Sequence, residues 1–179
     1  MALRKLFSEQ QIHDAVLRIA QEISRDFRDQ DITLVCVLKG SFLFTADLAR
    51  AIERIAASGK WVKTCRIEFM RASSYGDSEE PGDVEIKLDL DRSLRGLNVI
   101  LVEDIADTCQ TLAKLQAHLA LKEPQELRTA VLLTKPHKHE VEAQMDYVGI
   151  VGDGVGFVVG YGMDNAGTMR GLPYIGVIE

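Results

Sequence analysis

The sequence has no long apolar run, which argues against a protein embedded in a membrane. No stretch approaches the roughly 18 consecutive apolar residues that predict a transmembrane helix. Residues 1–11 hold no apolar run of the length found in secretory signal peptides, so we expect no leader of that kind. These absences favour a cytoplasmic protein without a membrane partner.

Cysteine is also scarce, and acidic residues outnumber basic ones. The three cysteines, Cys36, Cys65 and Cys109, lack the spacing of metal ligands, which favours reduced thiols in a cytosolic setting. A formal net charge of -6 argues against a surface that neutralises a nucleic-acid backbone, although it leaves room for a local basic pocket. No repeat, low-complexity segment or linker divides the 179 residues, so we predict one domain over residues 1–179.

Apolar runs alternate with helical patterns along the chain. Runs typical of strands buried on both faces occupy residues 32–38, 97–102 and 127–133. Shorter candidate strands occupy residues 147–151, 157–159 and 174–178. Helical spacing of apolar residues occurs at about 12–23, 42–55 and 110–121, and Ser8 with Gln11 forms a candidate capping box before the first. This alternation predicts a three-layer α/β fold, with a Rossmann-like, doubly wound parallel sheet between helices.

The middle of the chain has a different pattern. Residues 64–70 and 84–90 alternate between apolar and polar, which predicts an antiparallel pair with one face in water. The polar segment 71–83 between them is too long for a tight hairpin. A loop of that length inside a compact domain is usually functional or mobile.

The strand that ends at Val102 delivers two carboxylates, Glu103 and Asp104, to the sheet edge where ligands of doubly wound folds bind. Thr108 and Thr111 follow in a turn at a helix start, which suits a phosphate group. The carboxylates would repel that phosphate unless they hold ribose hydroxyls or hydrated Mg²⁺. An acidic helix N-terminus with Asp and Thr caps explains the same spacing equally well.

Residues 102–112, Val-Glu-Asp-Ile-Ala-Asp-Thr-Cys-Gln-Thr-Leu, resemble the phosphoribosyl pyrophosphate signature of type I phosphoribosyltransferases, in its hypoxanthine(-guanine) version. Four further matches stand in the family's order: Leu-Lys-Gly-Ser-Phe at 38–42, Ser-Ser-Tyr-Gly at 73–76, Leu-Thr-Lys-Pro at 133–136, and Phe-Val-Val-Gly-Tyr-Gly-Met-Asp at 157–164 with Arg170 behind it. Together they span nearly the whole chain. The resemblance implies the type I phosphoribosyltransferase fold, with a small hood and a mobile antiparallel flap.

The resemblance also implies a reaction in purine salvage. The 5-phosphoribosyl group of phosphoribosyl pyrophosphate would move to N9 of hypoxanthine or guanine, giving IMP or GMP and pyrophosphate. It further implies a homodimer or homotetramer. A xanthine- or guanine-specific enzyme and a nucleotide-sensing regulator on the same fold remain alternatives, although Asp107 and Lys135 favour a working enzyme.

The acidic residues would carry the sugar, the metal and the proton. By resemblance, Glu103 and Asp104 bind the ribose hydroxyls and Mg²⁺, and Asp164 contributes to a second Mg²⁺ site and to base recognition. Asp107 is the implied general base, which accepts the N7 proton as N9 bonds to the ribose carbon. Proton transfer of this kind typically contributes ~10²–10⁴-fold to the rate.

The remaining implied roles divide between the phosphates and the base. The 5′-phosphate would be held by Thr108, Cys109, Gln110 and Thr111. The pyrophosphate would contact Lys39, Gly40 and Arg170, and the family can have a cis peptide at the first two.

Contacts with the purine would come from Lys135 to its 6-oxo group, from Phe157 by stacking and from Val158 through its backbone. A lid would be formed by Ser73, Ser74, Tyr75 and Gly76. Without the resemblance, a solvated Lys135 and a core Phe157 would be the simpler interpretations.

Cys109 stands where the family usually has glycine, so a special backbone angle there would be strained by the side chain. A thiol at a helix start beside threonines is also expected to have a lowered pKa.

Two other motifs do not indicate a binding site. The Gly152-x-Gly154-x-Gly156 pattern precedes a strand rather than the helix that a dinucleotide fingerprint must open. His137-x-His139 has no partner cluster, which favours a solvated loop over a metal site.

Overall fold

The computed structural model describes residues 2–59, 62–73 and 85–178, apart from the side chain of Ser73. In chain order the elements are β1 (Leu3–Phe7), α1 (Glu9–Asp26), β2 (Asp31–Leu38), α2 (Phe42–Ala57), β3 (Thr64–Ser73), β4 (Glu85–Leu88), β5 (Asn98–Ala106), α3 (Gln110–Ala120), β6 (Glu126–Thr134), the 3₁₀ turn η1 (Pro136–Lys138), β7 (Tyr147–Val151), β8 (Val158–Val159) and β9 (Ile175–Ile178).

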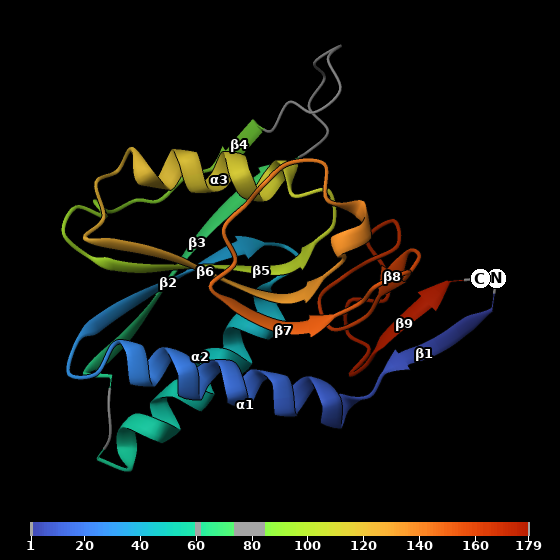
Figure 1. The fold of residues 1–179 in the computed structure, drawn as a ribbon, viewed down its shortest axis with the longest axis horizontal. Coiled ribbons are helices and arrows are strands. Elements are labelled where there is room, and N and C mark those ends of the chain that lie inside the picture. Colours follow the sequence, from blue (N-terminus) through green and yellow to red (C-terminus); the bar gives the residue numbers. More distant parts are fainter. Residues whose placement is uncertain (1, 60–61, 74–84, 179) are drawn as a thin grey trace.

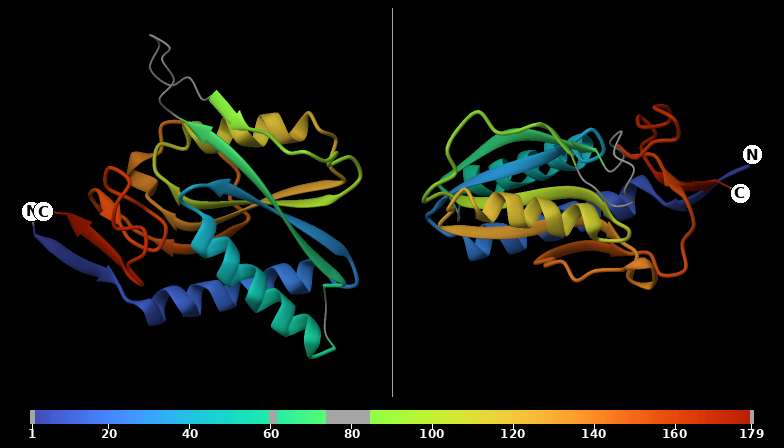
Figure 2. Two further views of the ribbon diagram at one scale, coloured as in Figure 1. Left: turned by 180° about the vertical axis from the view of Figure 1, so that it is seen from behind. Right: turned by 90° about the horizontal axis from the view of Figure 1, so that it is seen from above.

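A six-stranded sheet in the order β4-β3-β2-β5-β6-β7 forms the centre (Figure 1). Its strands are parallel except for β4, which runs antiparallel to β3. Helices α1 and α2 cover one face and α3 covers the other, as Figure 2 shows from two further directions. Successive residues of β2, such as Leu34 and Val35, are fully buried against opposite layers. The predicted three-layer fold is therefore confirmed.

A second, three-stranded antiparallel sheet in the order β1-β9-β8 lies beside the main sheet. It brings the two ends of the chain together, because Leu3 pairs with Ile178. This small sheet occupies the place of the expected hood. We did not predict β1, since its five exposed or half-buried residues contain two charges and become a strand only by pairing with β9 at the far end of the sequence.

The first helix begins with the predicted capping box. The Gln11 backbone N–H donates to Ser8 Oγ at 3.2 Å, and the Ser8 N–H donates to Gln11 Oε1 at 2.9 Å. These bonds satisfy N–H groups that have no partner within the helix. No helix in the part of the chain that the structure describes is long and apolar enough to cross a membrane.

The predicted antiparallel pair in the middle of the chain is present as β3 and β4. It is not a separate unit, because β3 also pairs in parallel with β2 along the whole of Asp31–Leu38. The predicted polar loop began at residue 71, whereas β3 extends to Ser73. Residues 74–84, which hold most of the predicted lid, lie outside the described residues.

Candidate active site

The carboxyl ends of β2, β5 and β6 meet at one edge of the sheet. Ala106 is paired with Thr134 in the β5–β6 register, and the Lys135 N–H donates to Ala106 O at 2.9 Å. After β2, the Leu38–Lys39 peptide bond is cis, one bond before the Lys39–Gly40 peptide to which the resemblance pointed. The strand ends that the sequence predicted to carry the site therefore converge on one edge of the sheet.

Glu103 and Asp104 lie side by side near the end of β5 with little charge compensation. Asp104 is 6% exposed, and Glu103 Oε2 is buried without a hydrogen-bond partner. Burial, and then the neighbouring charge of Asp104, raises the pKa of Glu103 well above its usual range. Burial also raises the pKa of Asp104, while the charge of Arg170 opposes that rise. Such a pair suits a cation or a set of hydroxyl donors.

Two glycines allow close contacts around Asp104, one with its carboxylate and one with the neighbouring backbone. A Cβ atom at Gly40 would collide with the carboxylate of Asp104, and a Cβ atom at Gly162 would collide with the carbonyl oxygen of Gly40. Gly162 also has a φ of +99°, which side chains rarely adopt. The turn after β2, the end of β5 and the segment after β8 are consequently in direct contact.

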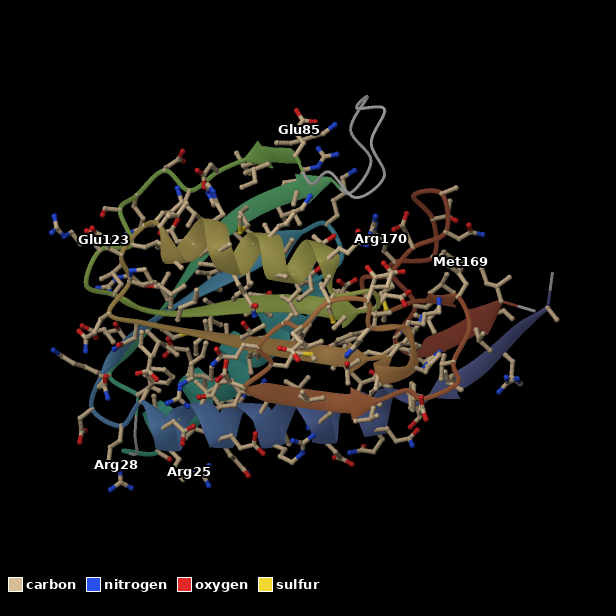
Figure 3. The ribbon with its side chains drawn as sticks, turned by 45° about the horizontal axis from the view of Figure 1, so that its top comes forward. Arg25, Arg28, Glu85, Glu123, Met169 and Arg170 are labelled. Atoms are coloured by element: carbon tan, nitrogen blue, oxygen red, sulfur yellow. The ribbon has the colours of Figure 1, made fainter. Side chains whose placement is uncertain are left out.

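Arg170 extends this group of residues. It lies on the segment between β8 and β9 (Figure 3), and its guanidinium donates to Gly162 O at 2.6 Å. It also pairs with Asp164 Oδ1 at 2.6 Å. The other oxygen of Asp164 accepts the Gly167 N–H at 2.6 Å. Asp164 and Arg170 are therefore held together next to Gly40 and Asp104.

Lys135 is 1% exposed, which excludes the interpretation of a solvated lysine. Its Nζ lies 2.7 Å from Gly156 O and 3.5 Å from Asp107 Oδ2. Burial lowers the pKa of Lys135, and the charge of Asp107 opposes that change. Lys138 Nζ also lies 3.5 Å from Asp107 Oδ2, and Asp107 Oδ1 is buried without a hydrogen-bond partner. A carboxylate with an unused oxygen thus faces a buried ammonium.

The turn expected to hold phosphate, residues 108–111, leads directly into α3. Cys109 adopts the left-handed conformation with a φ of 66°, so the expected special backbone angle is confirmed. The expected lowered pKa is wrong. Burial, and then the charge of Asp107, raises the pKa of the Cys109 thiol. The reason is that Cys109 is 3% exposed and belongs to the apolar layer around Leu112, so its thiol loses hydration.

A neighbouring loop supports the same turn. The Glu140 N–H donates to Thr108 O at 3.0 Å, and its carboxylate accepts from Gln110 Nε2 at 2.5 Å. Sequence reasoning missed this role of Glu140, because its partners lie some thirty positions away and no local pattern marks it. Among the described residues, no group of three or more His, Cys, Asp and Glu side chains could hold a metal ion.

Phe157 and Val158 differ in their surroundings. Phe157 is 56% exposed, so the alternative of a core residue is wrong, and it precedes rather than belongs to β8. Val158 is 5% exposed and pairs with Val177 in the small sheet. Of the predicted lid, Ser73 ends β3, and Ser74, Tyr75 and Gly76 lie outside the described residues.

Known proteins of one family resemble this chain over nearly its whole length. The phosphoribosyl transferase domain family matches residues 4–166. The hypoxanthine phosphoribosyltransferase of Escherichia coli (strain K12) is 38% identical over 177 residues, which cover 97% of this chain and 93% of that protein. A crystal structure of a hypoxanthine-guanine phosphoribosyltransferase from Bacillus anthracis, with a HEPES molecule in its active site, is 39% identical and has a TM-score of 0.86, covering 98% of both chains.

A structure of the hypoxanthine phosphoribosyltransferase from Trypanosoma cruzi in complex with the product IMP is 36% identical, with a TM-score of 0.86 and coverage of 98% of this chain and 94% of that chain. Sequence identity at this level over nearly the full length, together with the shared fold, shows common family membership and not the fold alone. The chain belongs to the phosphoribosyl transferase family, among its hypoxanthine(-guanine) members.

Proposed function

We propose that this protein is a purine-salvage enzyme that transfers the 5-phosphoribosyl group of phosphoribosyl pyrophosphate to N9 of hypoxanthine and guanine. The products are IMP or GMP and pyrophosphate. The observation that carries the proposal is the pairing of Asp107 with the buried Lys135, beside the two carboxylates at the end of β5. The relatives named hypoxanthine phosphoribosyltransferase support the choice of base.

Glu103 and Asp104 are the residues that we assign to the ribose hydroxyls and Mg²⁺. The buried, unpaired Oε2 of Glu103 and the raised pKa values of both carboxyls fit a site completed by a cation or by hydroxyl donors. Few protein ligands are needed, because Mg²⁺ is usually bound by one or two carboxylates together with substrate phosphates. When bound, the ion would neutralise the charge that grows on the departing pyrophosphate. We assign Asp164 to a second ion, which would compete with Arg170 for the carboxylate that the two residues pair through here.

Asp107 and Lys135 divide the chemistry at the base. The free oxygen of Asp107 would accept the N7 proton while N9 bonds to the ribose carbon. Lys135 would donate to the 6-oxo group and so disfavour adenine, whose amino group is itself a donor. Phe157 is exposed and available for stacking, and Val158 would contact the base edge through its backbone.

The phosphates would be held at the other end of the site. We assign the 5′-phosphate to residues 108–111, whose N–H groups stand at the start of α3. Lys39, Gly40 and Arg170 would contact the pyrophosphate, where developing charge is stabilised by preorganised donors. The lid that the resemblance implies for residues 73–76 would exclude water, which could otherwise capture the activated sugar.

We also propose that the protein forms a homodimer or homotetramer in the cytoplasm. Phe42, Ile67 and Phe69 are 39%, 40% and 49% exposed. Ile67 pairs with Leu34, which packs into the α1 and α2 layer, so Ile67 and Phe69 face the side of the sheet on which α2 begins with Phe42. Exposed apolar side chains on this face support a contact with a second copy.

An assay of purified protein tests the reaction. Phosphoribosyl pyrophosphate and Mg²⁺ are incubated with hypoxanthine, guanine, xanthine or adenine, and nucleotide formation is followed by chromatography. We expect IMP and GMP, with little AMP. A product from guanine and xanthine but not hypoxanthine would favour the alternative specificity, and no product from any base would favour a nucleotide-sensing regulator.

A further inference from the structure

Two segments that the sequence analysis set aside are in contact. His137 lies in η1, directly after β6, and the glycine-rich segment 152–156 follows β7. The Gly154 N–H donates to His137 Nδ1 at 3.1 Å. Asp153 Oδ1 lies 3.1 Å from the same ring nitrogen. The histidine that seemed a solvated loop residue is therefore bound to the glycine motif.

The glycine-rich segment is held at every second residue. The Gly152 N–H donates to Thr134 O at 2.9 Å, and Gly156 O accepts from Lys135 Nζ at 2.7 Å. His137 holds the residue between them. Gly154 has a φ of +70° and an added Cβ would meet nothing within 4 Å, so its own packing does not restrain it. Because a glycine backbone can adopt many conformations, the hydrogen bond to His137 is needed to fix the conformation of Gly154.

This segment determines the geometry of the base end of the site. Gly156 O orients the ammonium of Lys135, and Phe157 follows Gly156 directly. We propose that His137 is a positioning residue for the purine, which acts by fixing Gly154 and through it Gly156 O and Phe157. The inference rests on the proposed function, because it names a residue that supports recognition of the base in that same site.

The chemistry of the ring makes the inference specific. Nδ1 accepts from Gly154 only when it carries no proton, whereas a contact with Asp153 needs a proton there. The nitrogen therefore serves one of these partners at a time. Asparagine places its Oδ1 atom near the position of Nδ1 and can accept from Gly154, but alanine cannot. His137→Asn should accordingly retain the anchor that His137→Ala removes.

Steady-state kinetics with separate variation of both substrates tests the role. For His137→Ala we expect the KM for hypoxanthine to rise roughly two- to tenfold, the range of one net hydrogen bond. The KM for phosphoribosyl pyrophosphate and kcat should stay within about twofold, because the phosphate turn has other supports. His137→Asn should recover most of the loss, and His13→Ala serves as the matched control, since His13 lies on α1.

Equal increases of both KM values with a lowered Tm would show a general structural role and overturn the inference, as would an unchanged KM for hypoxanthine. Amide hydrogen exchange at Gly154, followed by nuclear magnetic resonance, needs no turnover. We expect faster exchange in His137→Ala than in the unmodified protein or in His137→Asn; equal exchange in all three would refute the anchor. A protein that is inactive with every base but shows this difference would instead contradict the proposed function.

Discussion

The ammonium of Lys135 lies 3.5 Å from Asp107 Oδ2, although the two residues are 28 positions apart in the sequence. The parallel register of β5 and β6 creates this contact, because Ala106 and Thr134 are paired immediately before them. A proton acceptor and a hydrogen-bond donor are thus presented together at one sheet edge.

Substitution of Asp107 by asparagine should lower turnover while leaving nucleotide binding largely intact. The side chain keeps its shape and can still accept a hydrogen bond, but it cannot take a proton at neutral pH. Loss of general-base catalysis corresponds to ~10²–10⁴-fold in kcat. The measurements are kcat for hypoxanthine and the dissociation constant of IMP by calorimetry. Undiminished turnover would refute the assignment of Asp107 as the base.

Lys135→Met should lower kcat/KM for hypoxanthine by about tenfold or more, because a hydrogen bond from a charged donor is worth about 1.5–3 kcal/mol. The preference over adenine should shrink as well. Lys138→Met provides a matched control, since Lys138 lies at the same distance from Asp107 but its side chain is 42% exposed. We expect a change within about threefold for this control, as for most exposed ion pairs. Equal losses in the two variants would contradict the role of Lys135.

Glu103→Gln should stabilise the protein without substrate or metal, and increasingly so as the pH rises. The pKa of Glu103 is raised above 4.5 in the folded chain, so the folded state binds this proton more tightly than the unfolded state does. The free energy of unfolding therefore falls as the pH rises from 4.5 through the raised pKa, and glutamine removes that loss.

The check is the difference in Tm between Glu103→Gln and the unmodified protein, measured with a chelator from about pH 4 to about pH 8. We expect the difference to grow toward the upper end of this range. A difference that is constant with pH would show that Glu103 does not titrate with a raised pKa. The same variant should bind Mg²⁺ with phosphoribosyl pyrophosphate more weakly, because a carboxylate ligand is lost.

Cys109→Gly should be more stable than Cys109→Ala by about 1 kcal/mol. Both variants lose the same buried thiol, but only glycine avoids the cost of about 1–2 kcal/mol for a Cβ atom in the left-handed region. The greater freedom of glycine in the unfolded chain offsets part of that gain. Urea denaturation of the two variants measures the difference. An alanine variant that is equally or more stable would mean that the φ of 66° carries no strain.

Local patterns predicted most of the elements, and the family resemblance pointed to the residues at the centre of the site. The apolar runs of β2, β5 and β6 and the capping box at Ser8 depend on neighbours within a few positions, so the sequence shows them directly. The convergence of Glu103, Asp107 and Lys135 follows from a general property of parallel sheets, in which strand ends share one edge. For these features the amino-acid sequence alone was sufficient.

Other features depend on partners that are distant in the sequence. β1 exists because it pairs with β9, and the thiol of Cys109 has a raised rather than a lowered pKa because it is buried in the layer beneath α3. His137 contacts Gly154 because η1 and the loop after β7 lie side by side. Pairing register and burial are set by the packed chain as a whole, so only the tertiary structure could decide them.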